Sequence, residues 1–268
     1  MSSVTQRIKE IKQPQGGYVR PKDFRVTQLE DGKFLAEDEN IHASLVGMAV
    51  DYLTRFQMGT PKEEAFAVSL LGAHIAHMRA RARLSTLSTE KEAASYLGYI
   101  NKRLSDMCIV SACKLVSFDV WYRNPFDAPS VKTAQEIEPD QATIGNIRIM
   151  VERSLKFWNQ YGPIVKDGFT FDPRGYTDTV TTGDGDFLTL DTLWDFKVSK
   201  AERLTSKQTL QLLMYWIMGQ HSGRAEFPSI RNLGVFNPRH NRVYLLDVNE
   251  ISYKTIQVVE REVIGYTY

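Results

Sequence analysis

The fold is decided by one stretch of the chain, residues 187–199, which reads FLTLDTLWDFKVS. The stretch is strand-like, and side chains two residues apart in an extended strand point to the same face. One face would carry Asp191, Leu193, Asp195 and Lys197. The other would carry Leu190, Thr192, Trp194, Phe196 and Val198. Because the second set is almost wholly apolar, we expect that face to be buried.

The polar face places a carboxylate, Asp195, beside an ammonium group, Lys197. A Mg²⁺ site for phosphodiester cleavage uses both groups, since the hard cation takes oxygen ligands and a neighbouring positive charge orients water or offsets developing charge. An Asp-x-Lys pair in a strand is more often part of a solvated alternating face. Residues elsewhere in the chain therefore decide between the two interpretations.

Bulk composition restricts the class of protein. The 33 basic and 32 acidic residues nearly cancel, so any nucleic-acid surface must be a local patch rather than a global charge excess. The two cysteines, Cys108 and Cys113, are too few for a disulfide framework, and we expect neither a zinc site nor an iron–sulfur cluster. No stretch has the apolar length of a signal peptide or a membrane span, so we expect a cytoplasmic protein with no membrane partner.

The pattern divides the chain into three segments: 1–40, 41–135 and 136–268. We expect the first to be an irregular N-terminal segment, with a turn at 30–33 between two short strands. We expect the second to be a helical region that packs on the third. Periodicity and capping signals predict its helices over 41–57, 60–83 and 89–110.

A cationic cluster lies in the second of these helices. It contains Arg79, Arg81 and Arg83, which are candidates for contact with a phosphate backbone. The alternative is a solvated helix end, where positive charge is favoured. His74 and His77 share a face of this helix but have no evident third ligand, so the pair does not predict a metal site.

The third segment alternates between helix and strand. The pattern predicts, in order, a helix over 144–158, strands over 164–171, 176–181 and 187–199, a helix over 206–219, and strands over 232–236 and 242–248. A glycine-rich turn at 182–185 would join the second and third strands. Thr205 and Gln208 form a capping-box pair at the start of the second helix.

Three motifs stand on these elements in order. They are Gly175-Tyr176-Thr177-Asp178, Asp195-Phe196-Lys197 followed by Ser199, and Gln211 with Tyr215 four residues later. The ordered set resembles the PD-(D/E)XK nucleases, and among them the RecB-like exonuclease branch. The resemblance implies an α/β fold with a restriction-endonuclease-like core, in which helices flank a central mixed sheet, and an N-terminal helical region.

The same resemblance implies a metal-dependent deoxyribonuclease. Its implied ligands for Mg²⁺ or Mn²⁺ are Asp178, Asp195 and the carbonyl of Phe196. Lys197 would orient or help deprotonate the attacking water, while Gln211 and Tyr215 would hold the DNA backbone or the metal shell. The resemblance further implies that the nuclease is an exonuclease of recombination or repair, of phage or prophage type. It also implies a possible recombination-protein partner.

The chain departs from the family pattern in its first helix. The RecB-like branch carries Gly-x-x-x-His there, whereas Gly47 is followed four residues later by Asp51. Aspartate also binds Mg²⁺ or Mn²⁺, so Asp51 is either a substitute ligand or a carboxylate on the helix surface.

The position of the turn raises a second question. Asp184 and Asp186 stand beside glycines and are interpreted as turn formers. A tight turn there would set Asp178 opposite Leu190 rather than Asp195, and a bulge or a wider loop would restore the match.

Two other functions stay open. The first is a nucleic-acid-binding module that keeps the fold without cleaving. The second is an interaction protein in which Asp195 and Lys197 form a surface ion pair, which stabilises a protein by less than about 1 kcal/mol.

Overall fold

The computed structural model describes residues 2–82 and 88–267. These form a mixed α/β protein in which the chain divides by its internal contacts into two units. Unit 1 combines Met1–Glu30 with Phe157–Tyr268, and unit 2 is Asp31–Lys156. The predicted segments 1–40, 41–135 and 136–268 have other bounds. Arg83 lies outside the described residues.

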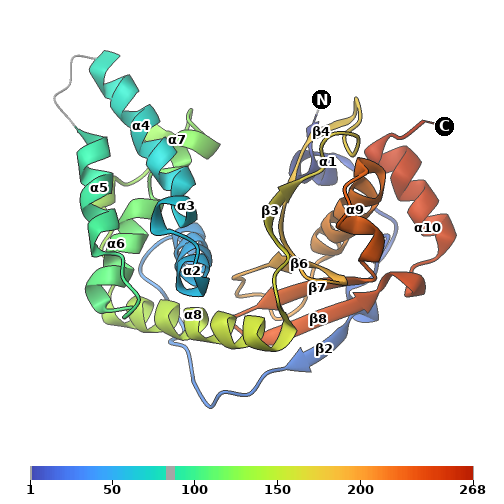
Figure 1. Ribbon diagram of the computed structural model, residues 1–268, viewed down its shortest axis with the longest axis horizontal. Coiled ribbons are helices and arrows are strands. Elements are labelled where there is room, and N and C mark those ends of the chain that lie inside the picture. The colour runs from blue at the N-terminus through green and yellow to red at the C-terminus, as the bar shows by residue number, and fades with distance from the viewer. Residues whose placement is uncertain (1, 83–87, 268) are drawn as a thin grey trace. The chain divides into compact units, whose positions relative to one another are not determined.

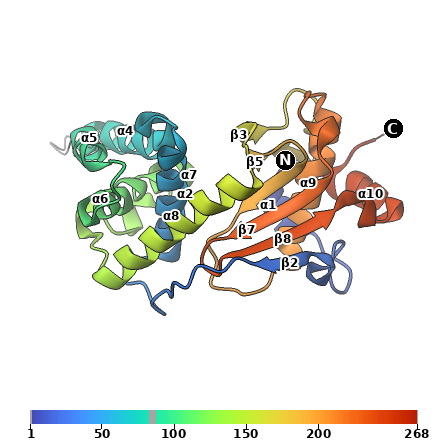
Figure 2. The same cartoon turned by 60° about the horizontal axis from the view of Figure 1, so that its bottom comes forward.

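Unit 1 is built on a mixed sheet that has six strands in the described residues. In spatial order the strands are β2 (Arg25–Gln28), β8 (Arg242–Asp247), β7 (Asn232–Asn237), β6 (Thr192–Phe196), β5 (Asp184–Leu188) and β3 (Lys166–Thr170). Neighbours run antiparallel except β6 and β7, which run parallel. Figure 2 shows β2 along the outer side of β8, at one edge of the sheet. The predicted strands over 164–171, 232–236 and 242–248 are therefore confirmed as β3, β7 and β8.

Strand β6 buries both of its faces. Leu193 packs in the core that helix α9 (Ser206–Ser222) covers. Trp194 packs on the opposite side, where its ring centroid lies 4.9 Å from that of Phe157, at the end of helix α8 (Gln141–Tyr161). Alternation is confirmed within β6, and it places Asp195 on the same side as Leu193, toward α9. Leu190, which was expected on the buried face, lies before the strand and is 66% exposed.

The expected single strand over 187–199 and the expected turn at 182–185 are wrong. The structure has a hairpin of β5 and β6, and its turn is closed by Thr189, whose N–H donates to the carbonyl of Thr192 at 3.0 Å. Gly185 lies within β5, where an added Cβ would stand 2.1 Å from Cζ of Phe169. The glycine thus makes room for the ring of Phe169. The local sequence does not reveal this reason for the glycine, because Phe169 belongs to another strand.

The N-terminal residues belong to unit 1. β1 (Ser2–Ser3) pairs in parallel with β4 (Val180–Thr182), and helix α1 (Val4–Glu10) follows with Ser3 as its N-cap. Arg7 of α1 donates to the carbonyl of Val263 at 2.8 Å. The segment expected to be irregular therefore contains β1, α1 and β2. The C-terminal end is helix α10 (Tyr253–Val258) and a π-helical turn, Val259–Ile264.

Unit 2 is largely helical (Figure 1). Its helices are α2 (Ala43–Met58), α3 (Lys62–Ala65), α4 (Ala67–Ala82), α5 (Thr89–Tyr99), α6 (Asp106–Val116), α7 (Asp119–Arg123) and most of α8. Two of the expected helices are each split in two, at Phe66 and at 100–105. Ser105 causes the second break, because its side chain caps α6 by accepting from the N–H of Cys108 at 3.3 Å.

Short 3-10 turns complete the chain at Pro21–Asp23, Ala128–Ser130, Ala134–Glu136, Phe227–Ser229 and Val248–Glu250.

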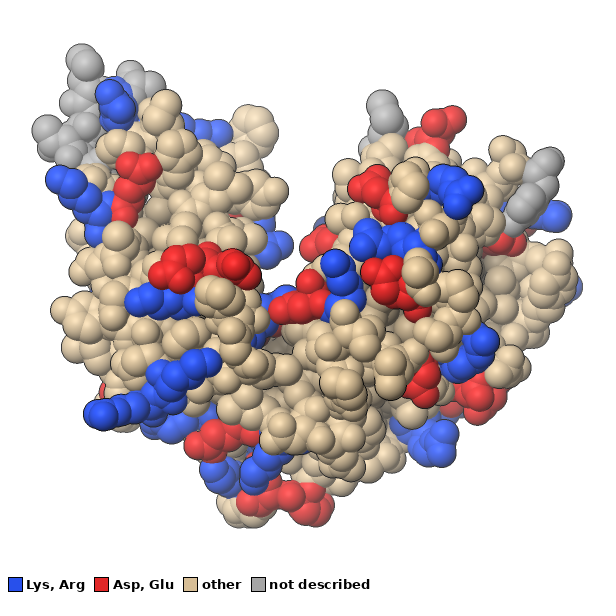
Figure 3. All heavy atoms as spheres, viewed as in Figure 1, with Lys and Arg blue, Asp and Glu red and all other residues tan. Residues whose placement is uncertain are grey.

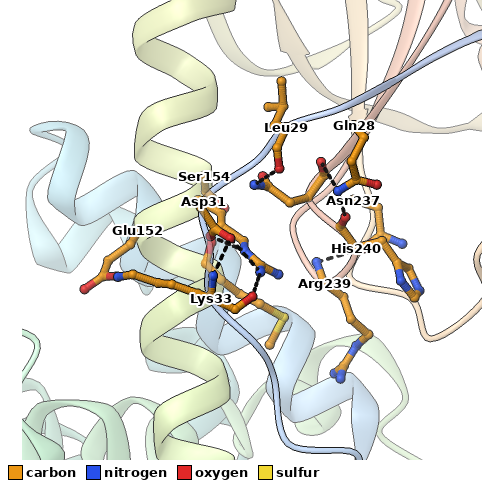
Figure 4. Close-up of polar contacts among 12 residues, drawn as sticks. Gln28, Leu29, Asp31, Lys33, Glu152, Ser154, Asn237, Arg239 and His240 are labelled. Atoms are coloured by element: carbon orange, nitrogen blue, oxygen red, sulfur yellow. Dashed lines mark hydrogen bonds and ion pairs between the residues drawn. The ribbon is translucent and has the colours of Figure 1, made fainter.

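A buried ion pair holds the first residues of unit 2. Asp31 accepts from Nε of Arg153 at 2.7 Å and from Nη2 at 3.1 Å, and Arg153 also donates to the carbonyl of Lys33 (Figure 4). Both side chains are less than a tenth exposed. The Arg153 guanidinium holds the pKa of Asp31 below its usual range, although burial acts in the opposite direction.

The surface carries both signs of charge. On the face shown in Figure 3, basic and acidic side chains are interspersed. None of the described helices combines the length and the apolar character needed to cross a lipid bilayer.

Candidate functional site

Two carboxylates face each other across the β5–β6 hairpin. Phe187 pairs with Trp194 and Leu188 with Leu193, so the next pair outward is Asp186 with Asp195. Oδ2 of Asp186 accepts a hydrogen bond from the N–H of Phe196 at 2.8 Å. The hairpin register therefore fixes the separation of the two side chains, on the face of the sheet toward α9.

Asp195 is almost fully enclosed, with 4% of its side chain exposed. Its Oδ1 atom pairs with Nζ of Lys197 at 2.9 Å. Its Oδ2 atom is buried and has no hydrogen-bond partner in the part of the chain that the structure describes. A buried acceptor without a donor is costly, so this oxygen is a place where a cation would replace lost hydration.

The charges of this group shift one another's pKa values. Burial, and then the negative charge of Asp186, raises the pKa of Asp195 to about 6 even though Lys197 acts to lower it. Burial also acts to lower the pKa of Lys197, but the charges of Asp195 and Asp186 outweigh it and raise that pKa to about 12. Lys197 therefore holds its proton at neutral pH and is a hydrogen-bond donor.

Helix α9 adds two polar groups above this face. Nε2 of Gln211 donates to Oη of Tyr215 at 2.9 Å, as expected for residues four apart on a helix. Tyr215 is 5% exposed, and burial raises the pKa of its hydroxyl well above the usual range. The charges of Asp195, Asp184 and Asp186 contribute to that rise.

Asp184 is a third carboxylate on this side. It stands two residues before Asp186 in β5 and therefore on the same face of the strand. Its charge adds to the raised pKa of Lys197. The sequence predicts Asp184 and Asp186 to be turn formers, and the structure places them in a strand instead. The spacing from Gly183 to Asp186 is the same Gly-x-x-Asp spacing as that from Gly175 to Asp178, and this signal could have identified Asp186.

Asp178 lies elsewhere in unit 1. It precedes β4, is exposed, and lines a shallow polar depression of about 490 Å³ with Tyr176, Thr181 and Tyr266. Among the described residues, no interaction joins Asp178 to Asp195. The sequence led us to expect Asp178 beside Asp195, whereas the hairpin sets Asp186 opposite Asp195.

Asp51 belongs to unit 2. It lies on α2, where its Oδ1 atom accepts from Nε of Arg55 at 2.9 Å, one helical turn away. Its role as a metal ligand stays a prediction.

The donor set of the hairpin suits Mg²⁺ or Mn²⁺. The described residues contain no group of three or more His, Cys, Asp or Glu side chains poised around one point, as a fully protein-built metal cage would require. Mg²⁺ keeps several waters and is usually held by one or two carboxylates together with substrate phosphate. Asp186 and Asp195 fit that pattern, since the Oδ2 atom of Asp195 is buried without a partner among the described residues and Lys197 pairs with Oδ1.

The chain matches no protein-family model, no curated protein and no solved structure.

Proposed function

We propose that the chain is a divalent-metal-dependent nuclease with a restriction-endonuclease-like core of the PD-(D/E)XK type, acting on DNA. The observation that carries the proposal is the buried, unpartnered Oδ2 atom of Asp195, set opposite Asp186 and beside Lys197. A surface ion pair would be exposed on both sides, and it would not enclose a second carboxylate.

The proposal assigns the metal ligands to Asp186, Asp195 and the carbonyl of Phe196. Mg²⁺ or Mn²⁺ bound there lowers the pKa of a coordinated water and offsets the charge that develops on the phosphate. The two carboxylates supply the negative charge that retains such a cation beside a phosphodiester. No iron–sulfur cluster is part of the proposal.

Lys197 acts as a hydrogen-bond donor in this site. Its raised pKa keeps the ammonium charged, so it orients the attacking water or a phosphate oxygen and does not remove a proton. In this proposal Gln211 and Tyr215 hold the DNA backbone or the metal shell, a role that the sequence resemblance implies, and the Gln211 amide fixes the orientation of the Tyr215 hydroxyl.

An exonuclease of recombination or repair is the preferred version. That preference rests on the sequence resemblance to the RecB-like branch, as does the suggestion of a phage or prophage origin and of a recombination-protein partner.

The test is cleavage of end-labelled linear DNA and of covalently closed circular DNA, with Mg²⁺ or Mn²⁺. Wild type is compared with Asp195→Ala, Lys197→Ala and, as a matched control, Lys254→Ala. Lys254 is an exposed lysine of α10 in the same unit. We expect wild type and the control to degrade linear DNA from its ends, and both site variants to be inactive while still folded by circular dichroism.

Other results would change the conclusion. Cleavage of circular DNA would keep the chemistry and make the protein an endonuclease. Metal-independent DNA binding without any cleavage would favour the binding module, and full activity of Asp195→Ala would remove the site.

A further inference from the structure

Unit 1 contains a cavity of about 630 Å³ outside the carboxylate site, and most of its charged lining is positive. We call it the basic cavity. Its lining cations are Arg20, Lys22, Arg203 and Arg242, and its lining carboxylate is Glu202. Buried apolar side chains, including Phe24, Leu204 and Tyr244, also line it.

One wall of the basic cavity is the loop over 198–205, which joins β6 to α9 and follows directly on Lys197. Side chains of β7, β8 and the turn between them hold three carbonyls of this loop. The bonds are Asn237 Nδ2 to Ser199 at 2.9 Å, His240 Nε2 to Lys200 at 2.9 Å, and Tyr244 Oη to Glu202 at 2.5 Å. The loop that carries Arg203 is therefore fixed before any ligand binds.

The N-terminal residues form another wall. Gly17 packs closely on the first turn of α9, since an added Cβ would stand 2.7 Å from Cβ of Ser206. The hydroxyl of Thr209 donates to the carbonyl of Val19 at 2.5 Å. These contacts hold Arg20 and Lys22 at the cavity against the same helix.

Two of the four lining cations have ion-pair partners among the described residues, and the other two do not. Arg20 pairs with Asp23 at 2.9 Å, and Arg242 lies 3.5 Å from Glu202. Lys22 and Arg203 have no hydrogen bond or ion pair with any residue that the structure describes, and both are exposed to solvent. Open cations on a preformed cavity suit an anion whose charge is shared by two oxygens that both accept hydrogen bonds, such as a phosphodiester.

We propose that the basic cavity binds a second phosphate of the DNA strand that is cleaved, in addition to the phosphate at the cleavage site. The inference rests on the proposed function, because it needs a strand at Lys197 that continues along the loop. The segment from Lys197 to Lys207 supports that path, because most of its charged residues are cations. They are Lys197, Lys200, Arg203 and Lys207, with Glu202 as the one carboxylate. The segment also leads into the N-terminus of α9, which is the positive end of the helix dipole.

The test measures binding of a fluorescently labelled single-stranded oligodeoxynucleotide by anisotropy in EDTA, over a range of salt concentrations. Wild type is compared with Arg203→Glu and with Lys254→Glu. Both variants change the net charge equally, but Lys254 is exposed on α10 and does not line the cavity. The absence of metal prevents cleavage, so the affinity reports contacts of the chain with the DNA backbone.

We expect Arg203→Glu to weaken binding about tenfold at low salt and to lower the slope of log affinity against log salt by about 0.7, the value of one phosphate contact on a single strand. Lys254→Glu should match wild type in both quantities. Equal weakening by the two variants, or a wild type that does not bind DNA in EDTA, would overturn the proposal.

Hydrolysis of bis(p-nitrophenyl) phosphate by wild type with Mn²⁺ tests the proposed function separately, because this small diester offers no second phosphate. Hydrolysis together with unchanged DNA affinity of Arg203→Glu would reject the basic cavity alone. Failure of wild type to hydrolyse either the diester or DNA would reject the nuclease itself.

Discussion

The carboxylate of Asp186 is bound to the backbone of the strand that carries Asp195, through the N–H of Phe196 at 2.8 Å. An asparagine at position 186 can still accept this hydrogen bond through its carbonyl oxygen, so Asp186→Asn removes the charge with little change in geometry. We expect metal-dependent DNA cleavage to fall by about a hundredfold or more, as for other groups that stabilise charge in a reaction. Steady-state cleavage of end-labelled DNA measures the loss.

The control for this prediction is Asp178→Asn, which neutralises the carboxylate that the sequence motif favoured. Asp178 is exposed and lies outside the hairpin, so this variant should retain most of the activity. The reverse pattern, with Asp178→Asn inactive and Asp186→Asn active, would return the metal ligand to position 178.

Bound metal should stabilise unit 1 through Asp195. A ligand that binds only the native state at a hundred times its Kd adds about 2.7 kcal/mol to the free energy of unfolding. We therefore expect Mn²⁺ to raise the Tm of wild type relative to EDTA, and to leave the Tm of Asp195→Ala unchanged. Differential scanning fluorimetry of both proteins, with Glu250→Gln as an exposed carboxylate control, measures the two shifts. Equal shifts in wild type and Asp195→Ala would mean that the metal binds elsewhere.

The Asp31–Arg153 pair predicts a dependence of stability on pH. The folded-state pKa of Asp31 lies below its unfolded value of about 3.9, so its contribution is fully present above that pH and is lost as the pH falls through the lower folded pKa. Asp31→Asn should lower the free energy of unfolding by about 3 kcal/mol at neutral pH, because a buried guanidinium loses its carboxylate.

Urea denaturation at pH 7 and at pH 3 measures this effect. The difference between wild type and Asp31→Asn should shrink at the lower pH. Glu63→Gln, an exposed carboxylate on α3 of the same unit, should match wild type at both. A difference that stays constant with pH would show that the ion pair does not account for the loss.

Gly185 should be intolerant of a side chain. Its added Cβ would stand 2.1 Å from Cζ of Phe169, and Phe169 is itself buried against Phe171 and Phe227. We expect Gly185→Ala to lower the free energy of unfolding by about 2 kcal/mol, the scale of an overpacked core. Gly98→Ala is the control, because nothing lies within 4 Å of its added Cβ on helix α5, and alanine there should stabilise slightly. Thermal denaturation of the two variants compares them directly.

The sequence predicted elements whose signals are local. The capping box of Thr205 and Gln208 is present, with the Thr205 N–H donating to Oε1 of Gln208 at 2.8 Å, and α9 begins at the next residue as expected. Alternation also predicts correctly that Leu193 and Trp194 lie on opposite faces, but it does not predict that both faces are buried, because that depends on α9 and on Phe157.

The hairpin could not be read from local signals. Gly185 is a glycine because Phe169 packs on it, and Phe169 is a neighbour only once β3 and β5 have paired. The turn at Thr189 contains no glycine or proline, so its composition looks like strand. Moving the turn changes the residue opposite Asp195 from the expected Asp178 to Asp186, which the interpretation of Asp184 and Asp186 as turn formers does not anticipate. Contacts between segments that are far apart in the chain determine where the turn lies.

Unit 1 is assembled from both ends of the described chain, since β1, α1 and β2 join strands and helices that follow residue 157. During synthesis β1, α1 and β2 leave the ribosome before their partners exist, and the whole of unit 2 is made in the interval. β2 can pair with β8 only once β8 itself has been made. A fragment that begins at the motif-bearing segment would expose the β8 edge and one face of α9, so experiments on the proposed chemistry call for a protein that includes residues 2–30 as well as the segment that contains the motifs.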